Sequence, residues 1–355
     1  MTSLQKTSIR NLFVIVMLTA LASVILGSDR QMKLSLNKKW KFQIGDDPEY
    51  AQVDFDDSDW SELRPGRAWE RQGYPGYDGY AWYRITFLVP EKLNKLSLGL
   101  DLGYIDDVDR VYVNGKHLNG KGVVEPYQTA FNERRQYPLP HSLIKFGEEN
   151  TIAIQVYDDE QDGGLVGGRV GIYAENRLKM TQDLSGEWLF SLGDDLSWKD
   201  PDFQDDDWET VLAPSTWANY GYAEYDGYGW YRKTFVPDES LKGEKVILVL
   251  GKIDDIDEVY INGKRIGRTG RFPGELYLDK NNSYYNRDRF YYVAPNVFKW
   301  NQANTIAIRV YDVWQIGGIY QGPIGLVLRD EYLKYKERGK TSFGDFLERL
   351  IENWD

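Results

Sequence analysis

The side chains of this sequence best suited to catalysis or metal binding are carboxylates in two nearly identical short runs. Ile105-Asp106-Asp107-Val108-Asp109 recurs in the second half as Ile253-Asp254-Asp255-Ile256-Asp257. Paired carboxylates can hydrolyse glycosidic bonds at separations of about 5–9.5 Å, and clustered carboxylate oxygens also suit calcium. Aspartates at a strand entry more often accept hydrogen bonds from turn amides. We favour this structural role for both runs, and keep hydrolysis and a structural calcium site as alternatives.

Histidine and cysteine offer little chemistry in this sequence. The two histidines are His117 and His141, cysteine is absent, and the repeat places Arg265 where the first copy has His117. A Ser-His-Asp triad would need a positioned histidine, and a zinc site needs several nitrogen or sulfur ligands. We therefore predict no catalytic residue and no metal ligand among the site residues.

Aromatic residues make up 15% of the chain and gather around two loops rich in tyrosine and glycine. Flat aromatic rings can stack on sugar rings with little loss of side-chain entropy, while aspartate and arginine bond hydroxyl groups. Some aromatic or basic residues of the second half have no clear twin in the first, which makes that half the better candidate. The predicted carbohydrate-binding residues are Tyr77, Asp78, Tyr80, Tyr225, Asp226, Tyr228, Arg271, Tyr284, Trp314 and Tyr320.

These candidate residues sit on a duplicated scaffold, because several motifs occur twice in the same order. The matching pairs include Trp40-Lys41-Phe42 with Trp188-Leu189-Phe190, Trp82-Tyr83-Arg84 with Trp230-Tyr231-Arg232, and Asn150-Thr151-Ile152 with Asn304-Thr305-Ile306. An ordered series of repeats indicates gene duplication and two similar structural units. We expect the repeated tryptophans to lie in the core, and Arg84 and Arg232 to pair with carboxylates inside the strands.

The local pattern of each copy predicts antiparallel strands. Val111-Tyr112-Val113 precedes Asn114-Gly115, and Val259-Tyr260-Ile261 precedes Asn262-Gly263, as in strands that enter a tight hairpin turn. No regular helical pattern separates the strands, which favours sandwiches over alternating βα units. We predict an all-β chain of two tandem jelly-roll β-sandwich domains with a short C-terminal helix.

The predicted domains are bounded by targeting and tail segments. A basic start and an apolar run of about 15 residues are typical of a signal peptide, so residues 1–28 are assigned as one. The jelly-roll domains follow at residues 29–178 and 179–331, and a helical tail at 332–355 is expected to pack on the second. We expect export to the periplasm or the extracellular space, with no membrane contact beyond the signal peptide. The net charge of −12 argues against a nucleic-acid partner.

The ordered motifs carry a family resemblance. Trp-Tyr-Arg at 82–84 and 230–232, the Ile-Asp-Asp-x-Asp runs, and the Asn-Gly turns together resemble galactose-binding-domain-like modules. The similarity is to the sugar-binding jelly-roll domain of family 2 glycoside hydrolases and, more closely, to the β-sandwich module of sialate O-acetylesterases. It covers about residues 33–175 and 180–330 and implies a fold and a link to carbohydrate. The barrel and the Gly-Asp-Ser segment that carry catalysis in those enzymes have no match in this sequence.

The expected function is therefore an exported, non-catalytic carbohydrate-binding protein whose partner is an oligo- or polysaccharide. A separate glycan-degrading enzyme is a second candidate partner. A third hypothesis is a structural or assembly module whose helical tail, residues 332–355, docks a separate catalytic chain. No cofactor is expected beyond the calcium alternative. The competing hypothesis is a glycoside hydrolase or carbohydrate esterase, or its accessory subunit, acting on glycosides or acetylated sugars.

Overall fold

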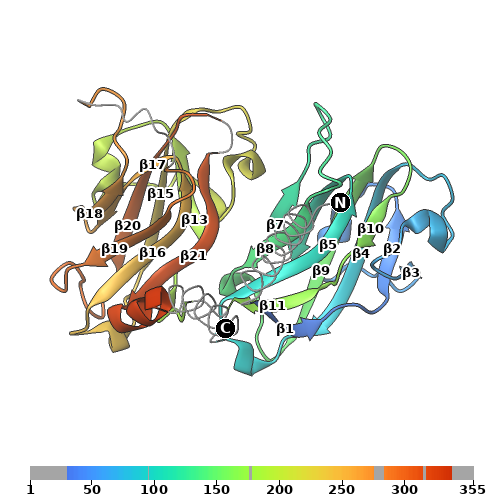
Figure 1. The fold of residues 1–355 in the computed structure, drawn as a ribbon, viewed down its shortest axis with the longest axis horizontal. Helices are drawn as coiled ribbons and strands as arrows, with labels where there is room; N and C mark the ends of the chain where they lie inside the picture. The colour runs from blue at the N-terminus through green and yellow to red at the C-terminus, as the bar shows by residue number, and fades with distance from the viewer. Residues whose placement is uncertain (1–29, 95, 176–177, 276–283, 315–316, 338–355) are drawn as a thin grey trace, which may run out of the picture.

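The computed structural model describes residues 30–94, 96–175, 178–275, 284–314 and 317–337. The predicted signal peptide at residues 1–28 and most of the predicted tail lie outside these ranges. The described chain is almost entirely β, as predicted, and forms four sheets that lie in two groups side by side (Figure 1). Strands β1 to β11 form the group that we call the first sandwich, and β12 to β21 form the second sandwich.

Each sandwich contains a six-stranded sheet with the same strand order. In the first sandwich the order is β3 (Ser61–Leu63), β2 (Trp40–Ile44), β4 (Gly79–Leu88), β9 (Glu149–Asp158), β6 (Val108–Val113) and β7 (Lys116–Lys121). In the second it is β14 (Glu209–Ala213), β13 (Gly186–Leu192), β15 (Gly227–Phe235), β20 (Asn304–Asp312), β17 (Ile256–Ile261) and β18 (Lys264–Thr269). The sequence repeat is thus a repeat of strand order.

A smaller sheet covers one face of each six-stranded sheet. The first contains β1 (Arg30–Ser35), β11 (Gly171–Glu175), β5 (Leu98–Asp106), β10 (Gly164–Gly167) and β8 (Arg134–Leu139). The second contains β12 (Gln182–Asp183), β21 (Gly318–Leu328), β16 (Val246–Asp254) and β19 (Asp288–Val293). All ladders between these strands are antiparallel in the described part of the chain, as predicted. One long strand, β21, covers the positions that β10 and β11 share in the first sandwich.

The two main cores lie between the sheets of each pair. Tyr83 and Ile154 of the first six-stranded sheet and Leu100 of the facing sheet belong to one fully buried cluster. Tyr231 and Leu248 occupy the corresponding cluster of the second sandwich. Burial of such side chains stabilises each by roughly 1.5–3 kcal/mol relative to exposure, so each sandwich has a core of its own.

The Trp-Tyr-Arg segment shows why this motif is repeated. Because successive side chains of a strand point to opposite faces, Tyr83 enters the main core while Trp82 and Arg84 lie on the outer face. Trp82 packs there in a smaller buried cluster, and Arg84 donates a 2.8 Å hydrogen bond to Asp57. Arg232 makes the same bond to Asp205 at 2.6 Å, and both guanidinium groups are almost fully buried. The predicted internal arginine pairs are confirmed.

Short helical elements connect and cover the strands. A helix over residues 329–337, and thus starting before the predicted 332, packs Tyr332 and Tyr335 against Phe290 of β19. No helix in the described ranges has the length and apolarity needed to span a bilayer. The 3₁₀ turns are η1 (Pro48–Ala51), η2 (Trp69–Gln72), η3 (Glu91–Leu93), η4 (His141–Leu143), η5 (Leu196–Lys199), η6 (Trp217–Tyr220) and η7 (Glu239–Leu241).

Candidate functional site

The strand register brings aspartates from two segments together at one end of each sandwich. In the first sandwich, Gly79 at the start of β4 pairs with Asp158 at the end of β9, and Val108 at the start of β6 pairs with Tyr157. Asp106 lies opposite Gly164 in the facing sheet. Because these segments end at the same edge, their side chains converge there. The second sandwich repeats the arrangement.

The convergent side chains form two acidic triads. Carboxylate oxygens of Asp106, Asp107 and Asp158 lie within 4.8 Å of one another, and so do those of Asp254, Asp255 and Asp312. Asp106 is half-buried, whereas the other members are buried. Asp109 and Asp257, the last aspartates of the repeated runs, are not members of the triads. Their place is taken by the last residues of β9 and β20.

Asp109 and Asp257 instead form buried ion pairs with arginines from the facing sheet. Arg135 Nε donates to Asp109 at 2.6 Å and Arg289 Nε donates to Asp257 at 2.7 Å, with no exposed side-chain area in either pair. Tyr137 also donates to Asp109 at 2.6 Å. Since the side chains of residues 107 and 109 leave a turn in different directions, the repeated motif serves two purposes. The last aspartate of each run forms an ion pair between the two sheets, and the first two aspartates belong to the triad at the strand end.

The expected hydrogen bonds to turn amides are present in part. Asp107 accepts from the backbone N–H of Asp159 at 3.2 Å, and also from the hydroxyl groups of Tyr127 and Thr129. Asp255 accepts from the backbone N–H of Val313 at 3.2 Å. The favoured structural role therefore holds for the second aspartate of each run.

Burial and crowding give most of the triad carboxyls abnormal acidity. Loss of solvent, with Asp107 nearby, raises the pKa of Asp106 to about 7, and the pKa of Asp158 rises to about 8 for the same reasons. In the second sandwich, burial and the neighbouring Asp255 raise the pKa of Asp254 to about 8, while that of Asp312 rises to about 7. Burial and mutual repulsion make it unfavourable for all of these neighbouring carboxyl groups to be ionised at once.

The tyrosines of the two repeated loops lie beside the triads but are half-buried. Tyr77 and Tyr225 pack against the cores, and their hydroxyl groups donate to the carbonyls of Tyr80 and Tyr228 at 2.6 and 3.0 Å. These contacts give both tyrosines a structural role. Asp78 and Asp226 are exposed, and their charges raise the pKa values of Asp158 and Asp312.

Tyr80 and Tyr228 pack on the aromatic residues of the neighbouring strands. Tyr80 lies 4.8 Å from Tyr157, and Tyr228 lies 4.6 Å from Tyr311 between ring centroids. Tyr228 also stacks on Phe272 at 5.8 Å. Both residues are half-buried, and the Arg309 guanidinium also lies 4.8 Å from the centroid of the Tyr228 ring. Their contact with sugar remains a prediction.

The unrepeated candidates of the second sandwich differ in exposure. Trp314 follows the triad member Asp312 by two residues, and its backbone N–H donates to Asp312 at 3.2 Å. The residue is 71% exposed. Tyr320 is half-buried, and burial followed by the nearby Asp254 charge raises its pKa to about 12. Its hydroxyl donates to the carbonyl of Tyr285 at 2.7 Å. Tyr285 is 48% exposed. Trp314 and Tyr320 therefore belong to the triad end of the second sandwich.

Arg271 and Tyr284 lie in the segments that follow β18 and precede β19. Arg271 is exposed, and its charge helps to lower the pKa of Glu275 after the larger effect of Arg268. Tyr284 carries the Arg287 guanidinium 4.7 Å above its ring. The structure thus places Tyr284 in a cation–π contact rather than on an open face.

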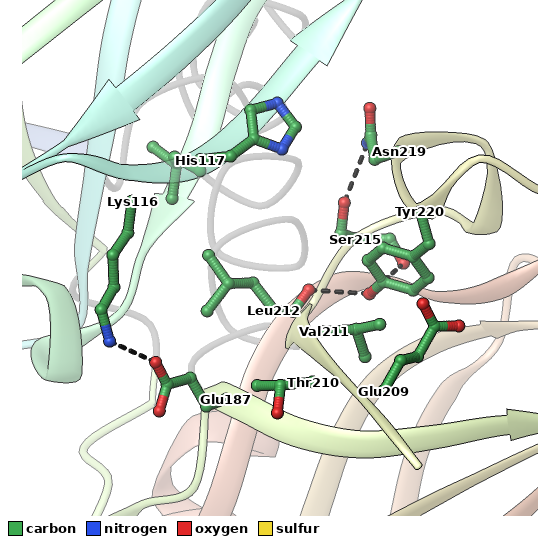
Figure 2. A pocket seen from close by; sticks show the side chains of 11 residues that line it. Lys116, His117, Glu187, Glu209, Thr210, Val211, Leu212, Ser215, Asn219 and Tyr220 are labelled. Atoms are coloured by element: carbon green, nitrogen blue, oxygen red, sulfur yellow. Dashed lines mark hydrogen bonds and ion pairs between the residues drawn. The ribbon is translucent and has the colours of Figure 1, made fainter. Parts of the chain in front are cut away.

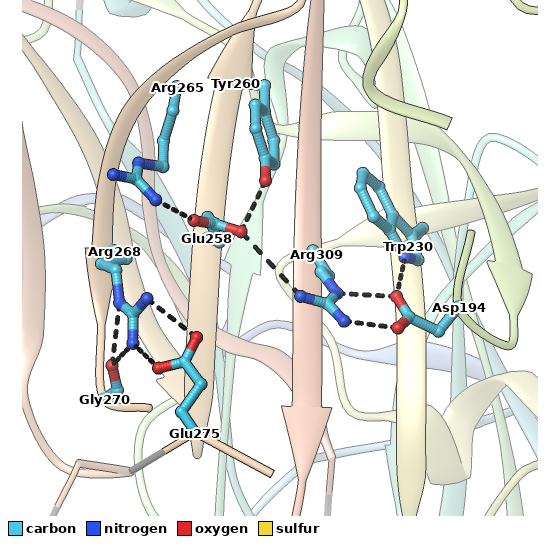
Figure 3. A network of polar contacts seen from close by, with 9 residues as sticks. All are labelled: Asp194, Trp230, Glu258, Tyr260, Arg265, Arg268, Gly270, Glu275 and Arg309. Carbon is cyan, nitrogen blue, oxygen red and sulfur yellow. Dashed lines mark hydrogen bonds and ion pairs between the residues drawn. The ribbon is translucent and has the colours of Figure 1, made fainter. Parts of the chain in front are cut away.

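The outer face of the second six-stranded sheet is closed by a charged network that the sequence did not predict. Arg309 lies between Asp194 and Glu258, and Trp230 donates to Asp194 at 3.1 Å (Figure 3). The Arg309 guanidinium also covers the ring of Phe272 at 4.0 Å. In the first sandwich Gln155 takes the place of Arg309, and the buried Trp82 Nε1 has no hydrogen-bond partner.

A polar pocket of about 330 Å³ lies between the two sandwiches. Lys116 and His117 of the first sandwich face Glu187, Glu209 and Asn219 of the second, and Lys116 forms an ion pair with Glu187 (Figure 2). Its volume is at the lower end of the range for small-molecule sites. No sequence motif indicated this pocket, because its walls come from different repeats.

Comparison with known proteins relates this architecture to carbohydrate-active enzymes. Residues 193–314 match the family model of the beta-galactosidase second all-beta domain. A beta-galactosidase of Bacteroides ovatus is 29% identical over 158 residues, which are 39% of this chain and 17% of that enzyme. A beta-glucuronidase of Formosa agariphila is 27% identical over 152 residues, 39% of this chain and 15% of that enzyme.

The chain thus spans less than a fifth of the length of these relatives. Among solved structures, a beta-glucuronidase of Bacteroides uniformis aligns with a TM-score of 0.37 at 16% identity, covering 81% of this chain and 29% of that one. The matches support a domain like those of family 2 beta-galactosidases and beta-glucuronidases. The resemblance to sialate O-acetylesterases remains a prediction.

Proposed function

We propose that the chain binds carbohydrate through the triad end of its second sandwich and does not hydrolyse it. The exposed side chain of Trp314 is the observation that carries this proposal. At 71% exposure the indole makes little contribution to the core, yet the backbone N–H of Trp314 donates to the buried Asp312 at 3.2 Å, and Tyr320 lies near Asp254 of the same triad. An exposed aromatic plane flanked by polar groups is suited to stack on a sugar ring while neighbouring groups bond its hydroxyls.

The surroundings of Trp314 extend this surface. Val313, next to Trp314 in the chain, is 44% exposed, and Tyr285, whose carbonyl accepts a hydrogen bond from Tyr320, is 48% exposed. Asp226 adds an exposed carboxylate close to Asp312. Apolar side chains can stack on the C–H face of a pyranose, and carboxylates can accept hydrogen bonds from its hydroxyl groups. The names of the relatives make galactose- and glucuronate-containing glycans the first ligands to test.

The burial of the acidic triads favours binding over catalysis. A glycosidase needs two carboxyl groups that both reach the scissile bond, whereas Asp254, Asp255 and Asp312 have at most 5% of their surface exposed. A substrate could not approach all three without opening the strand end. Loss of nitrophenyl galactoside or glucuronide hydrolysis on Asp254→Asn substitution would contradict this part of the proposal.

Binding can be tested by calorimetry with galactose- and glucuronate-terminated oligosaccharides. We expect a heat of binding that Trp314→Ala reduces at least tenfold in affinity, with an unchanged melting temperature because the indole is exposed. Tyr292→Ala is the matched control, since Tyr292 is 51% exposed on β19 and away from the triad. Equal loss in both variants, or no binding by the native chain, would contradict the proposal.

The finer aspects of the function follow from the sequence. We propose that each sandwich is a jelly roll of the galactose-binding-domain-like group, with the sialate O-acetylesterase module as its nearest type. We also propose export through residues 1–28 to the periplasm or extracellular space. A separate glycan-degrading enzyme is the proposed protein partner. Fractionation of cells that produce the full chain and a pull-down with and without residues 338–355 test these two points.

A further inference from the structure

The third aspartate of each acidic triad has carboxylate oxygens that are buried without a hydrogen-bond donor. Both carboxylate oxygens of Asp158 lack a partner, as does Oδ2 of Asp312, and neither side chain is exposed. Burying a polar atom without a hydrogen-bond partner destabilises the folded state, and the effect is larger for a charged group. Each orphaned oxygen belongs to a carboxylate within 4.8 Å of two others. Three such carboxylates repel one another unless a proton or a cation lies between them.

The nearby arginines do not supply the missing partner. Arg135 directs its Nε to Asp109 and its other nitrogens to the carbonyls of Ala130, Glu133 and Asp107. Arg289 is engaged in the same way with Asp257 and backbone carbonyls. Among the residues that the structure describes, no lysine, arginine or histidine forms an ion pair with Asp158 or Asp312.

We propose that each acidic triad binds one divalent cation, with calcium as the expected ion. Calcium prefers six to eight oxygen ligands at about 2.3–2.6 Å, including carboxylates that bind through one or both oxygens. Three carboxylate oxygens that lie within 4.8 Å of one another are close enough to contact a single ion at such distances. The ligands are oxygens alone, which disfavours ions that prefer nitrogen or sulfur.

Because the chain is duplicated, a triad aspartate with a buried carboxylate oxygen that lacks a hydrogen-bond donor occurs in each sandwich. The two triads occupy equivalent positions, although their surroundings have diverged. Asp107 accepts from Tyr127 and Thr129, whereas Asp255 accepts from the backbone of Val313. An orphaned, buried oxygen persists in both settings. The orphaned oxygen is therefore a feature of the triad itself and does not depend on the structure of one particular loop.

The sites are proposed independently of glycan binding and are tested by counting ions. The full chain is stripped with EGTA, dialysed, and titrated with calcium chloride in a calorimeter, and the bound calcium is measured by plasma mass spectrometry. We expect two ions per chain and a higher melting temperature with calcium than with chelator. No bound calcium at millimolar concentration and an unchanged melting temperature would overturn the proposal, whatever the result with glycans.

Substitutions in one sandwich leave the other as an internal control. We expect Asp312→Asn and Asp254→Asn each to reduce the stoichiometry from two ions to one, and Asp158→Asn to remove the other ion. The matched controls are Asp59→Asn and Asp207→Asn, which change equivalent exposed aspartates and should retain two ions. The remaining ion reports that a variant is folded. Retention of two ions by both Asp158→Asn and Asp312→Asn would place the calcium elsewhere and contradict the assignment.

Discussion

Arg289 and Asp257 form an ion pair of 2.7 Å with no exposed side-chain area, between the two sheets of the second sandwich. Tyr291 donates a second hydrogen bond to the same carboxylate. The pair fixes the turn between β16 and β17, and this turn carries Asp254 and Asp255. The integrity of the triad end therefore depends on a contact that takes no part in binding.

Removal of one member of this pair should strongly destabilise the chain. We expect Asp257→Asn to lower the free energy of unfolding of the second sandwich by about 3–5 kcal/mol, because a buried guanidinium loses its counter-ion. Urea unfolding measures the change. The exposed Asp207→Asn should alter the stability by less than about 0.5 kcal/mol. A similar small loss for Asp257→Asn would mean that the pair does not hold the sheets.

The Asn-Gly turn after β17 offers a test of the repeated motif. Asn262 has a φ of 50°, and its side chain donates to the carbonyl of Val297 at 2.9 Å and accepts from the amide of Thr305 at 3.1 Å. Asn262→Ala should cost about 2–4 kcal/mol, because it loses these bonds and strains the backbone. Asn262→Gly loses the bonds without the strain and should cost less. Equal losses would show that the backbone conformation is unimportant here.

His117 should make the first sandwich less stable in mild acid. Burial, and the nearby Arg110, lower the pKa of this histidine below its usual 6.5, and its Nε2 is buried without a partner. The folded state then binds fewer protons than the unfolded state. The contribution of His117 to the free energy of unfolding is therefore fully present above pH 6.5 and is lost as the pH falls below that value. His117→Gln removes this contribution.

Chemical denaturation of both proteins at pH 7.5 and pH 5.5 isolates the histidine. The raised pKa values of Asp106 and Asp158 act in the opposite direction in both proteins. We therefore expect the free energy of unfolding of the native chain to fall relative to that of the His117→Gln variant over this interval. An identical change in the two proteins would contradict the role of His117.

The sequence predicted the features that depend on local pattern and on repetition. The strands, the tight turns at Asn114-Gly115 and Asn262-Gly263, and the buried pairs of Arg84 and Arg232 all follow from motifs a few residues long. Because the repeat preserved them twice, each copy supported the interpretation of the other.

The composition of the triads could not be predicted, because it depends on long-range register. Asp158 lies beside Asp106 only because β9 pairs with β4 and β6 so that its last residue reaches the strand end. Asp109 turns away because Arg135, on another strand, offers a buried counter-ion. A signal was nevertheless present, since Tyr157-Asp158 and Tyr311-Asp312 are part of the repeat.

The central claim is that Trp314 contacts a glycan at the triad end of the second sandwich, and calorimetry on the full chain tests it most directly. The native chain, Trp314→Ala and Tyr292→Ala are titrated with the galactose- or glucuronate-terminated oligosaccharide that gives the strongest heat. The account predicts that affinity falls at least tenfold in Trp314→Ala and stays within twofold of the native value in Tyr292→Ala. Unchanged affinity in Trp314→Ala would contradict it.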